Sequence, residues 1–133
     1  MKVSPKSLVR TIPVHEIESL ASTVFDALKP SIVQSLTDFV DHIDAESTQR
    51  LEESLFDLLL ELARRLMAKL FNSLQPDVEE LPARVSHRGH RYRRMQTASP
   101  RERVTRFGKV TLTRARFRRG RGGKTIFPLE IAL

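Results

Sequence analysis

Residues 47–74 read STQRLEESLFDLLLELARRLMAKLFNSL, and this stretch decides how the first half of the chain folds. Neither Gly nor Pro interrupts it, and acidic side chains lead while basic ones follow, as the helix dipole favours. The leucines recur every three or four residues, which is the spacing of one face of an α-helix. They are Leu51, Leu55, Leu58, Leu62, Leu66, Leu70 and Leu74. The spacing predicts a long helix that ends at Gln75-Pro76.

The apolar stripe of this helix is wider than the seam of a coiled coil, because its period drifts from about 3.5 residues toward 4. Two interpretations stay open. In the first, the stripe is the core-facing side of a helix that packs on the preceding segments. In the second, part of residues 47–74 is a surface for a homodimer, since little of the chain remains to cover both faces of so long a helix.

Two shorter helices are predicted upstream. Residues 16–28 place apolar side chains at helical spacing, and residues 30–44 do the same after Pro30. Pro30 is expected to break or kink the helix, because it has no N–H to donate, and a second helical segment is expected to start there. Residues 1–15, which contain two prolines, are expected to form an irregular leader. The prediction for residues 16–75 is therefore an acidic domain of about three helices.

Charge divides the chain into two parts. Residues 1–82 carry 8 Lys/Arg and 14 Asp/Glu, whereas residues 83–133 carry 15 Lys/Arg and 2 Asp/Glu. Thirteen of those 15 are Arg, whose planar guanidinium suits bidentate contact with phosphate. The basic part predicts a polyanionic partner. The alternative is a solubilising surface that pairs with the chain's own acidic half.

The basic part has β character toward its end. Residues 76–100 are expected to be a basic connector, and residues 101–133 a small antiparallel meander, so the predicted fold class is α+β. A type II′ turn is predicted at Gly108-Lys109, which pairs Phe107 with Val110. A bulge is expected at 113–114, a flexible basic loop at 118–123, and a third strand at 125–127. Residues 129–133 form an apolar run that predicts a longer parent protein.

Several chemistries lack candidate residues in this sequence. It contains no Cys, so disulfides, thiolate catalysis and zinc–thiolate sites are excluded. His87 and His90 share a loop but have no partners at metal-ligand spacing, so no metal and no cofactor are predicted. The acids lie on helix faces rather than in catalytic pairs, and no catalytic residue is predicted. No run is long enough to span a membrane and no signal peptide is evident, so a cytoplasmic location is expected.

The predicted nucleic-acid-binding residues come from the basic part. Tyr92 is expected to be exposed and to stack on bases, because it lies among arginines. The predicted phosphate contacts are Arg88, Arg91, Arg93, Arg94, Arg101, Arg103, Arg106, Arg114, Arg116, Arg118, Arg119 and Arg121.

Residues 88–133 resemble a segment near the N-terminus of bacterial insertion-sequence transposases, the Kra-type and related DDE families. The family's pattern is an Arg-rich segment, a T-x-F-G-x-V hairpin, a short loop and a hydrophobic-Pro-Leu-acid run. The matching residues here are Thr105, Phe107, Gly108, Val110, Leu112, Arg114, Phe117, Phe127, Pro128, Leu129 and Glu130. This chain lacks the Cys pairs that relatives often carry near the hairpin.

The resemblance implies a DNA-binding N-terminal region of such a transposase, or a truncated relic of one. It also implies that the catalytic acids would lie beyond residue 133, so the chain itself is not expected to be an enzyme. Duplex DNA is the expected partner. The alternative function is a helical dimerisation or interaction module whose basic tail binds RNA or acidic partners without specificity.

Overall fold

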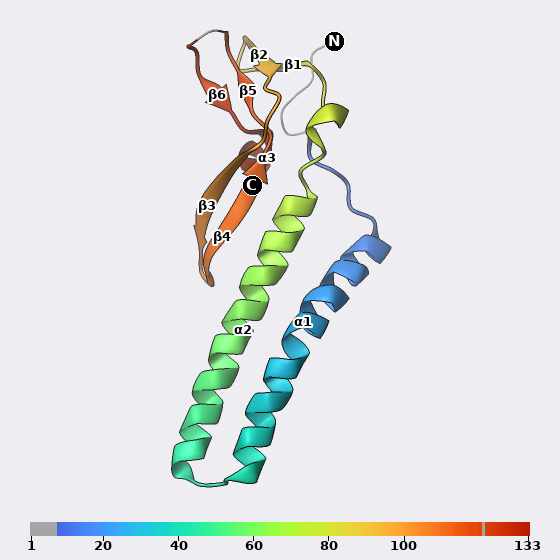
Figure 1. The fold of residues 1–133 in the computed structure, drawn as a ribbon. Helices are drawn as coiled ribbons and strands as arrows, with labels where there is room; N and C mark the ends of the chain where they lie inside the picture. The colour runs from blue at the N-terminus through green and yellow to red at the C-terminus, as the bar shows by residue number, and fades with distance from the viewer. Residues whose placement is uncertain (1–7, 121) are drawn as a thin grey trace. The chain divides into compact units, whose positions relative to one another are not determined.

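The computed structural model describes residues 8–120 and 122–133. It has an α+β fold, as predicted, in which long helices precede antiparallel sheets (Figure 1). The chain divides into two compact units. The helical unit comprises residues 13–69 and 104–110, and the sheet unit comprises residues 8–12, 70–103 and 111–133.

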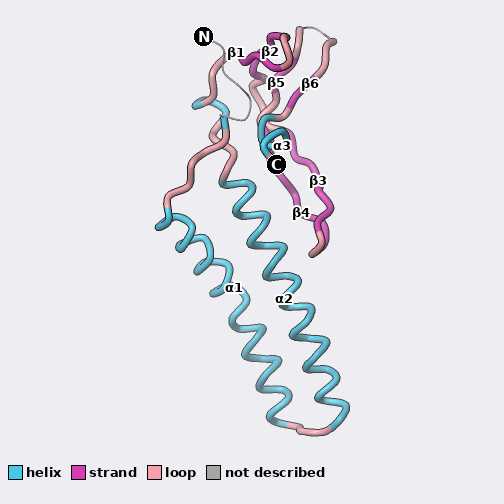
Figure 2. Tube along the Cα trace, turned by 180° about the vertical axis from the view of Figure 1, so that it is seen from behind, coloured by secondary structure: helices cyan, strands magenta, loops and turns pink. Residues whose placement is uncertain are grey.

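Two main helices form the helical part, not about three as predicted. Helix α1 spans Val14–Asp41 and continues through Pro30. The apolar spacing continues across this proline, so Val24 and Leu28 before it are buried and Ile32 after it is half-buried. Of the two outcomes expected at Pro30, a break or a kink, the structure has the kink: Pro30 removes one helix hydrogen bond and bends the helix, and the bend is visible in Figures 1 and 2.

Helix α2 spans Ala45–Ser73, which confirms the helix predicted over 47–74. Asp44 begins it, because its Oδ1 accepts a hydrogen bond of 2.7 Å from the backbone N–H of Ser47. α1 and α2 run antiparallel in the helical unit, and the Ser35 and Ser54 hydroxyls share a hydrogen bond between them.

The predicted connector, residues 76–100, contains regular structure. A 3₁₀ helix, η2, spans Val78–Glu80, and strands β1 (Arg84–His87) and β2 (His90–Arg94) form a hairpin. Arg88 and Gly89 make its turn with φ of 49° and 79°, the positive values that a type I′ turn requires. The hairpin joins β5 (Phe117–Arg118) and β6 (Thr125–Ile126) in a four-stranded antiparallel sheet of order β1-β2-β5-β6.

The second sheet is the hairpin of β3 (Ser99–Thr105) and β4 (Gly108–Arg114). Its two-residue turn is Arg106-Phe107, so the turn predicted at Gly108-Lys109 is wrong. The Thr105 hydroxyl closes the turn by accepting a hydrogen bond from the Phe107 N–H and donating one to the Gly108 carbonyl. Gly108 has the predicted positive φ, 116°, but as the first residue of β4.

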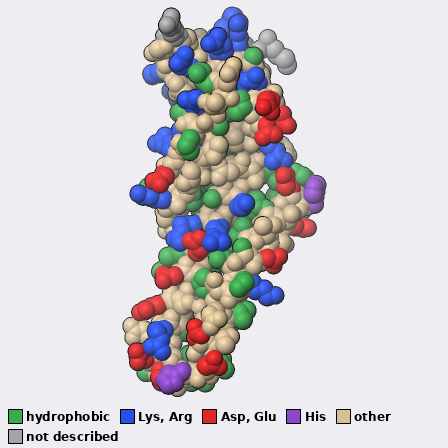
Figure 3. All heavy atoms as spheres, viewed as in Figure 1, with side chains coloured by type: hydrophobic (Ala, Val, Ile, Leu, Met, Phe, Trp, Pro, Cys, Tyr) green, Lys and Arg blue, Asp and Glu red, His purple; other side chains and the backbone are tan. Residues whose placement is uncertain are grey.

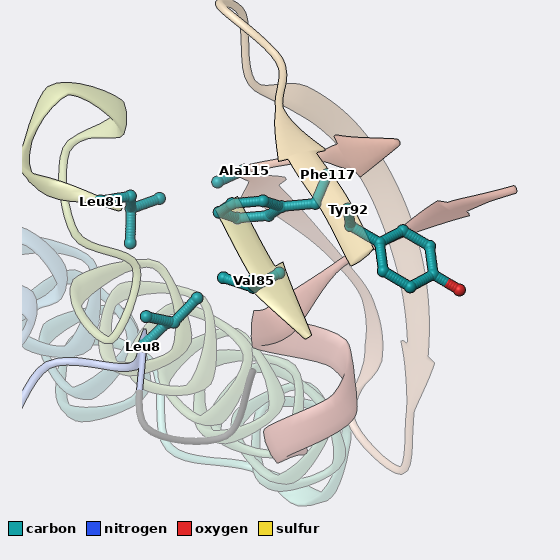
Figure 4. Close-up of a cluster of buried hydrophobic side chains, with 6 residues drawn as sticks. All are labelled: Leu8, Leu81, Val85, Tyr92, Ala115 and Phe117. Atoms are coloured by element: carbon teal, nitrogen blue, oxygen red, sulfur yellow. The ribbon is translucent and has the colours of Figure 1, made fainter. Parts of the chain in front are cut away.

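The other β predictions are met in part. β4 continues to Arg114, and the buried positions change phase between Arg114 and Ala115, beside the bulge predicted at 113–114. The predicted third strand is β6, and a short helix α3 follows at Pro128–Ala132. In the sheet unit, a buried apolar cluster lies against one face of the four-stranded sheet (Figure 4). Its members are Leu8, Leu81, Val85, Tyr92, Ala115 and Phe117. None of the described helices is long and apolar enough to cross a membrane.

Candidate nucleic-acid interface

Three arginines stand side by side across the four-stranded sheet. Arg84 of β1 is the direct partner of Arg93 in β2, and Arg93 is the direct partner of Arg118 in β5. Arg118 in turn faces Thr125 of β6. Adjacent strands lie about 4.8 Å apart, so the three arginines form a row about 10 Å long.

The pairing separates the two faces of this sheet. Side chains alternate along a strand, so Val85, Tyr92 and Phe117 point to the face opposite the arginine row. That opposite face carries the apolar cluster and is buried. Arg91 lies two residues from Arg93 and therefore shares its face. Arg84, Arg91, Arg93 and Arg118 are called the basic face below.

The basic face borders a hollow that is open to solvent. The hollow measures about 580 Å³, and the four arginines contribute to its lining together with Tyr92, Met95 and Gly120. Arg84, Arg91 and Arg93 are exposed, and Arg118 is half-buried. Figure 3 shows Lys and Arg side chains gathered around β1 and β2, whereas Asp and Glu side chains are spread along α1 and α2.

No ion pair neutralises the basic face within residues 8–120 and 122–133, and every Asp and Glu of the sequence lies in those ranges. Like charges directly opposite each other across a sheet are unfavourable.

The arginines of the helical unit differ, because Arg64 and Arg65 both contact Glu61. Hydrogen bonds from Arg64 and Arg65 hold the pKa of Glu61 below its ordinary value.

Arg114, which the sequence predicts as a phosphate contact, is buried in the structure. Its side chain is 6% exposed, its Nη1 lies 2.9 Å from a Glu130 carboxylate oxygen, and its guanidinium lies 3.6 Å from the centre of the Phe127 ring. Arg114 is the last residue of a strand whose alternate side chains, Val110 and Leu112, are buried, so the register turns it inward. Arg114 therefore packs within the fold, and its charge is paired with Glu130.

Tyr92 was predicted to be exposed and is instead 5% exposed. It alternates with the exposed Arg91 and Arg93 along β2, which places it on the buried face. Its ring also contacts His87 at 6.4 Å between ring centres. In Figure 4 the ring points away from Leu8 and Leu81. Because the side chain is 5% exposed, the ring is not free to stack on a base.

Two more predicted contacts are held within the sheet unit. Arg94 donates to the carbonyl oxygens of Val78 and Leu81, and Arg116 donates to the Thr97 hydroxyl at 2.8 Å. Arg101 is exposed and pairs with Glu130 at 3.2 Å. Arg94 and Arg116 keep their charge but have fewer free N–H donors for a ligand, whereas the charge of Arg101 is paired.

The remaining predicted residues are spread over turns and loops. Arg88 lies in the β1–β2 turn and Arg106 in the β3–β4 turn, and both are exposed. Arg103 is half-buried in β3, and Arg119 is exposed after β5. Arg121 lies outside the described residues. Arg84 was not predicted as a site residue. It lies beside Arg93 because the type I′ turn at Arg88-Gly89 folds β1 back onto β2, and that turn sequence between two alternating segments could have indicated the hairpin.

The described residues hold no cluster of three or more His, Asp or Glu side chains with metal-ligand geometry. No family model, curated protein or solved structure matches this chain. The candidate interface therefore rests on the geometry and charge of the basic face itself.

Proposed function

We propose that the sheet unit binds duplex DNA through the basic face, as the non-catalytic DNA-binding region of an insertion-sequence transposase. The observation that supports this most directly is the row of Arg84, Arg93 and Arg118, which lie in register and have no acidic partner among the described residues. A row of unneutralised guanidinium groups is favourable only when an anion lies over it.

The charge of the whole unit favours the same partner. Counting residues 1–12 with it, the sheet unit carries 16 Lys/Arg and 5 Asp/Glu. The helical unit carries 7 Lys/Arg and 11 Asp/Glu, so the two units have net charges of opposite sign. A polyanion is therefore attracted to the sheet unit specifically.

The length of the row fits a nucleic-acid backbone. Duplex DNA carries about one negative charge per 1.7 Å of helix axis, so a row about 10 Å long faces more than one phosphate. The side chains present guanidinium groups and no base-reading helix, so this contact positions the protein and carries no sequence information. The transposase-like residues 88–133 are what favour DNA over other polyanions.

The test compares two triple variants of the full chain with equal net charge. In the first, Arg84, Arg93 and Arg118 are replaced by Gln. In the control, Arg50, Arg65 and Lys69 of the helical unit are replaced by Gln. Each lost phosphate contact reduces the magnitude of the slope of log K against log salt by about 0.9. The slope of the first variant should therefore be smaller in magnitude than the parent's by roughly 2 to 3. The control should keep the parent's slope.

Equal losses in both variants would contradict a localised interface, and an unchanged slope in the first would overturn the basic face. A second titration compares duplex DNA with duplex RNA of the same sequence. Tighter binding of the RNA would contradict the transposase assignment while leaving the basic face as a polyanion site.

A further inference from the structure

We infer that the basic face holds an unpaired nucleotide of the bound DNA, whose base packs against Met95. This inference rests on the proposed function and refines it, because it adds a place for a base to the contacts with phosphate. Met95 directly follows β2 and lies two residues from Arg93. Side chains alternate along a strand, so Met95 shares the side of the sheet on which the basic face lies.

The pairing of the sheet continues past the end of β2. The Arg94 N–H donates a hydrogen bond of 2.8 Å to the Ala83 carbonyl oxygen. On the other side of the strand, the Met95 N–H donates one of 2.9 Å to the Arg116 carbonyl oxygen. Arg116 lies two residues before Arg118 and shares its face. The backbone therefore places Met95 beside Arg116, next to the arginine row.

Met95 is half-buried, but its burial does not come from the apolar cluster. Among the described residues, the partly buried side chains that pack against that cluster are Val78 and Ile126. Met95 instead lines the hollow beside the basic face. An unbranched thioether thus lies among guanidinium groups, where it adds nothing to the apolar core of the sheet unit.

A second hollow, of about 570 Å³, adjoins the first, because Arg93 and Met95 line both. Arg116 also lines the second hollow and is held there by Thr97, whose hydroxyl and carbonyl oxygens accept hydrogen bonds from it. Sites for small molecules measure roughly 300–1,000 Å³, so each hollow has room for a nucleotide. Met95 is therefore an apolar centre between two hollows whose linings include arginines.

This combination suits a nucleotide that exposes both of its chemical parts. Guanidinium groups bind phosphate oxygens, and their planar faces stack on bases. A thioether packs favourably against an aromatic ring. A nucleotide of an intact duplex offers this face its phosphate while its base stays stacked and paired, so Met95 has no ring to contact.

An unpaired strand is the DNA that meets both requirements. Turning a base out of a duplex costs the energy of unstacking and unpairing, whereas an unpaired base is free to turn toward the protein. The preferred ligand is therefore a duplex that continues into a single-stranded overhang. Packing on a thioether and on guanidinium planes tolerates every base, so no sequence preference is expected.

The test measures the binding of the full chain to three DNAs by fluorescence anisotropy at one salt concentration. These are a blunt duplex, the same duplex with a thymidine overhang, and the same duplex with an abasic overhang of equal length. The two overhangs carry the same number of phosphates, so a difference between them comes from the bases. The parent should bind the thymidine overhang about fivefold to tenfold more tightly than the abasic one. Equal affinity for these two DNAs would overturn the inference.

Substitutions at Met95 locate the base. Met95→Gln keeps the length of the side chain but removes its apolar character, so the preference for the thymidine overhang should be lost while the affinity for the blunt duplex is kept. Met95→Leu should retain most of the preference. Met67→Gln changes another half-buried methionine, in α2, and is the matched control that should behave as the parent. A preference that survives in Met95→Gln, or that falls equally in Met67→Gln, would contradict the assignment.

Photochemical cross-linking places the base without a substitution. A photoreactive thymidine analogue in the overhang should attach to residues 91–97 of the parent. Attachment confined to the helical unit would rule out the contact with Met95.

The two proposals fail in different ways. Binding of the blunt duplex with a steep salt slope, but with no preference for the thymidine overhang, would overturn only the packing of a base on Met95. A chain that binds none of the three DNAs at low salt would overturn the proposed function and this inference with it.

Discussion

Arg64 of α2 donates a hydrogen bond of 2.7 Å from Nη1 to the carbonyl oxygen of Phe107, in the turn of the β3–β4 hairpin. Both residues belong to the helical unit. The stem of Arg64 also passes beside Gly108, where a Cβ would lie 2.9 Å from the Arg64 Cδ. The conformation of this turn therefore depends on Gly108 in two ways, through its positive φ and through the space that it leaves.

Gly108→Val should destabilise the hairpin by about 1–3 kcal/mol, because a β-branched residue is strained at a φ of 116°. Amide exchange across residues 101–114 measures the change. The same substitution in an Arg64→Ala background separates the two effects, and most of the loss should remain there because Arg64 is a flexible side chain that can move aside. Equal exchange in variant and parent would contradict the strain.

Arg114→Gln should lower the free energy of unfolding by about 2–4 kcal/mol, because it removes one partner of a largely buried ion pair. Urea denaturation measures this loss. The salt slope of DNA binding by the folded variant should equal that of the parent, since Arg114 is not on the basic face. A slope lowered by about 0.9 would instead show that Arg114 reaches a phosphate.

Phe117→Ala and Leu28→Ala should act on different units. Phe117 is fully buried in the sheet unit, and its truncation should cost about 3–5 kcal/mol. Leu28 is buried in the helical unit, and its truncation should cost about 2–5 kcal/mol. Amide exchange should accelerate mainly in the unit that carries the substitution. Uniform acceleration in both variants would show that the two units unfold together.

Acid should weaken the start of α2. The Ser47 backbone N–H, and after it the Ser47 side chain, holds the pKa of Asp44 below its ordinary value of 3.8. Because the folded-state pKa is the lower one, the stabilisation is present above 3.8 and is lost as pH falls through the folded-state pKa. The melting temperature of the parent should therefore fall more over this pH range than that of Asp44→Asn, which keeps the cap without the charge. Identical pH profiles would contradict a charged cap.

The sequence was most informative where one periodicity holds without competition. The α2 prediction succeeded because leucine spacing, charge order and the Gln75-Pro76 stop agree. At Pro30 the local rule allows a break or a kink, and the burial of Val24 and Leu28 favours one bent helix over two separate ones. Packing depends on the whole helix pair, so the residues around the proline do not predict it.

The candidate interface was harder to predict, since it depends on register. Composition identified the basic segment, but only strand pairing separates the exposed Arg93 from Arg94, which is held by carbonyl oxygens on the other face. Shifting a strand by one residue exchanges its faces. Residues 76–100 were predicted as a connector, and the turn signal at Arg88-Gly89 was not used, so Arg84 was missed and Tyr92 was misplaced.

Asn72, at the end of α2, protects the edge of β4 from pairing with a strand of another molecule. Its side-chain N–H donates a hydrogen bond of 3.0 Å to the Thr111 carbonyl oxygen, and its Oδ1 accepts one of 2.7 Å from the Thr113 backbone N–H. Thr111 and Thr113 lie on the same edge of β4, so one carboxamide occupies the place of a neighbouring peptide group there. An unpaired strand edge invites growth of the sheet from one molecule into the next. Asn72 blocks that edge, and replacing it with Leu would leave a template for aggregation.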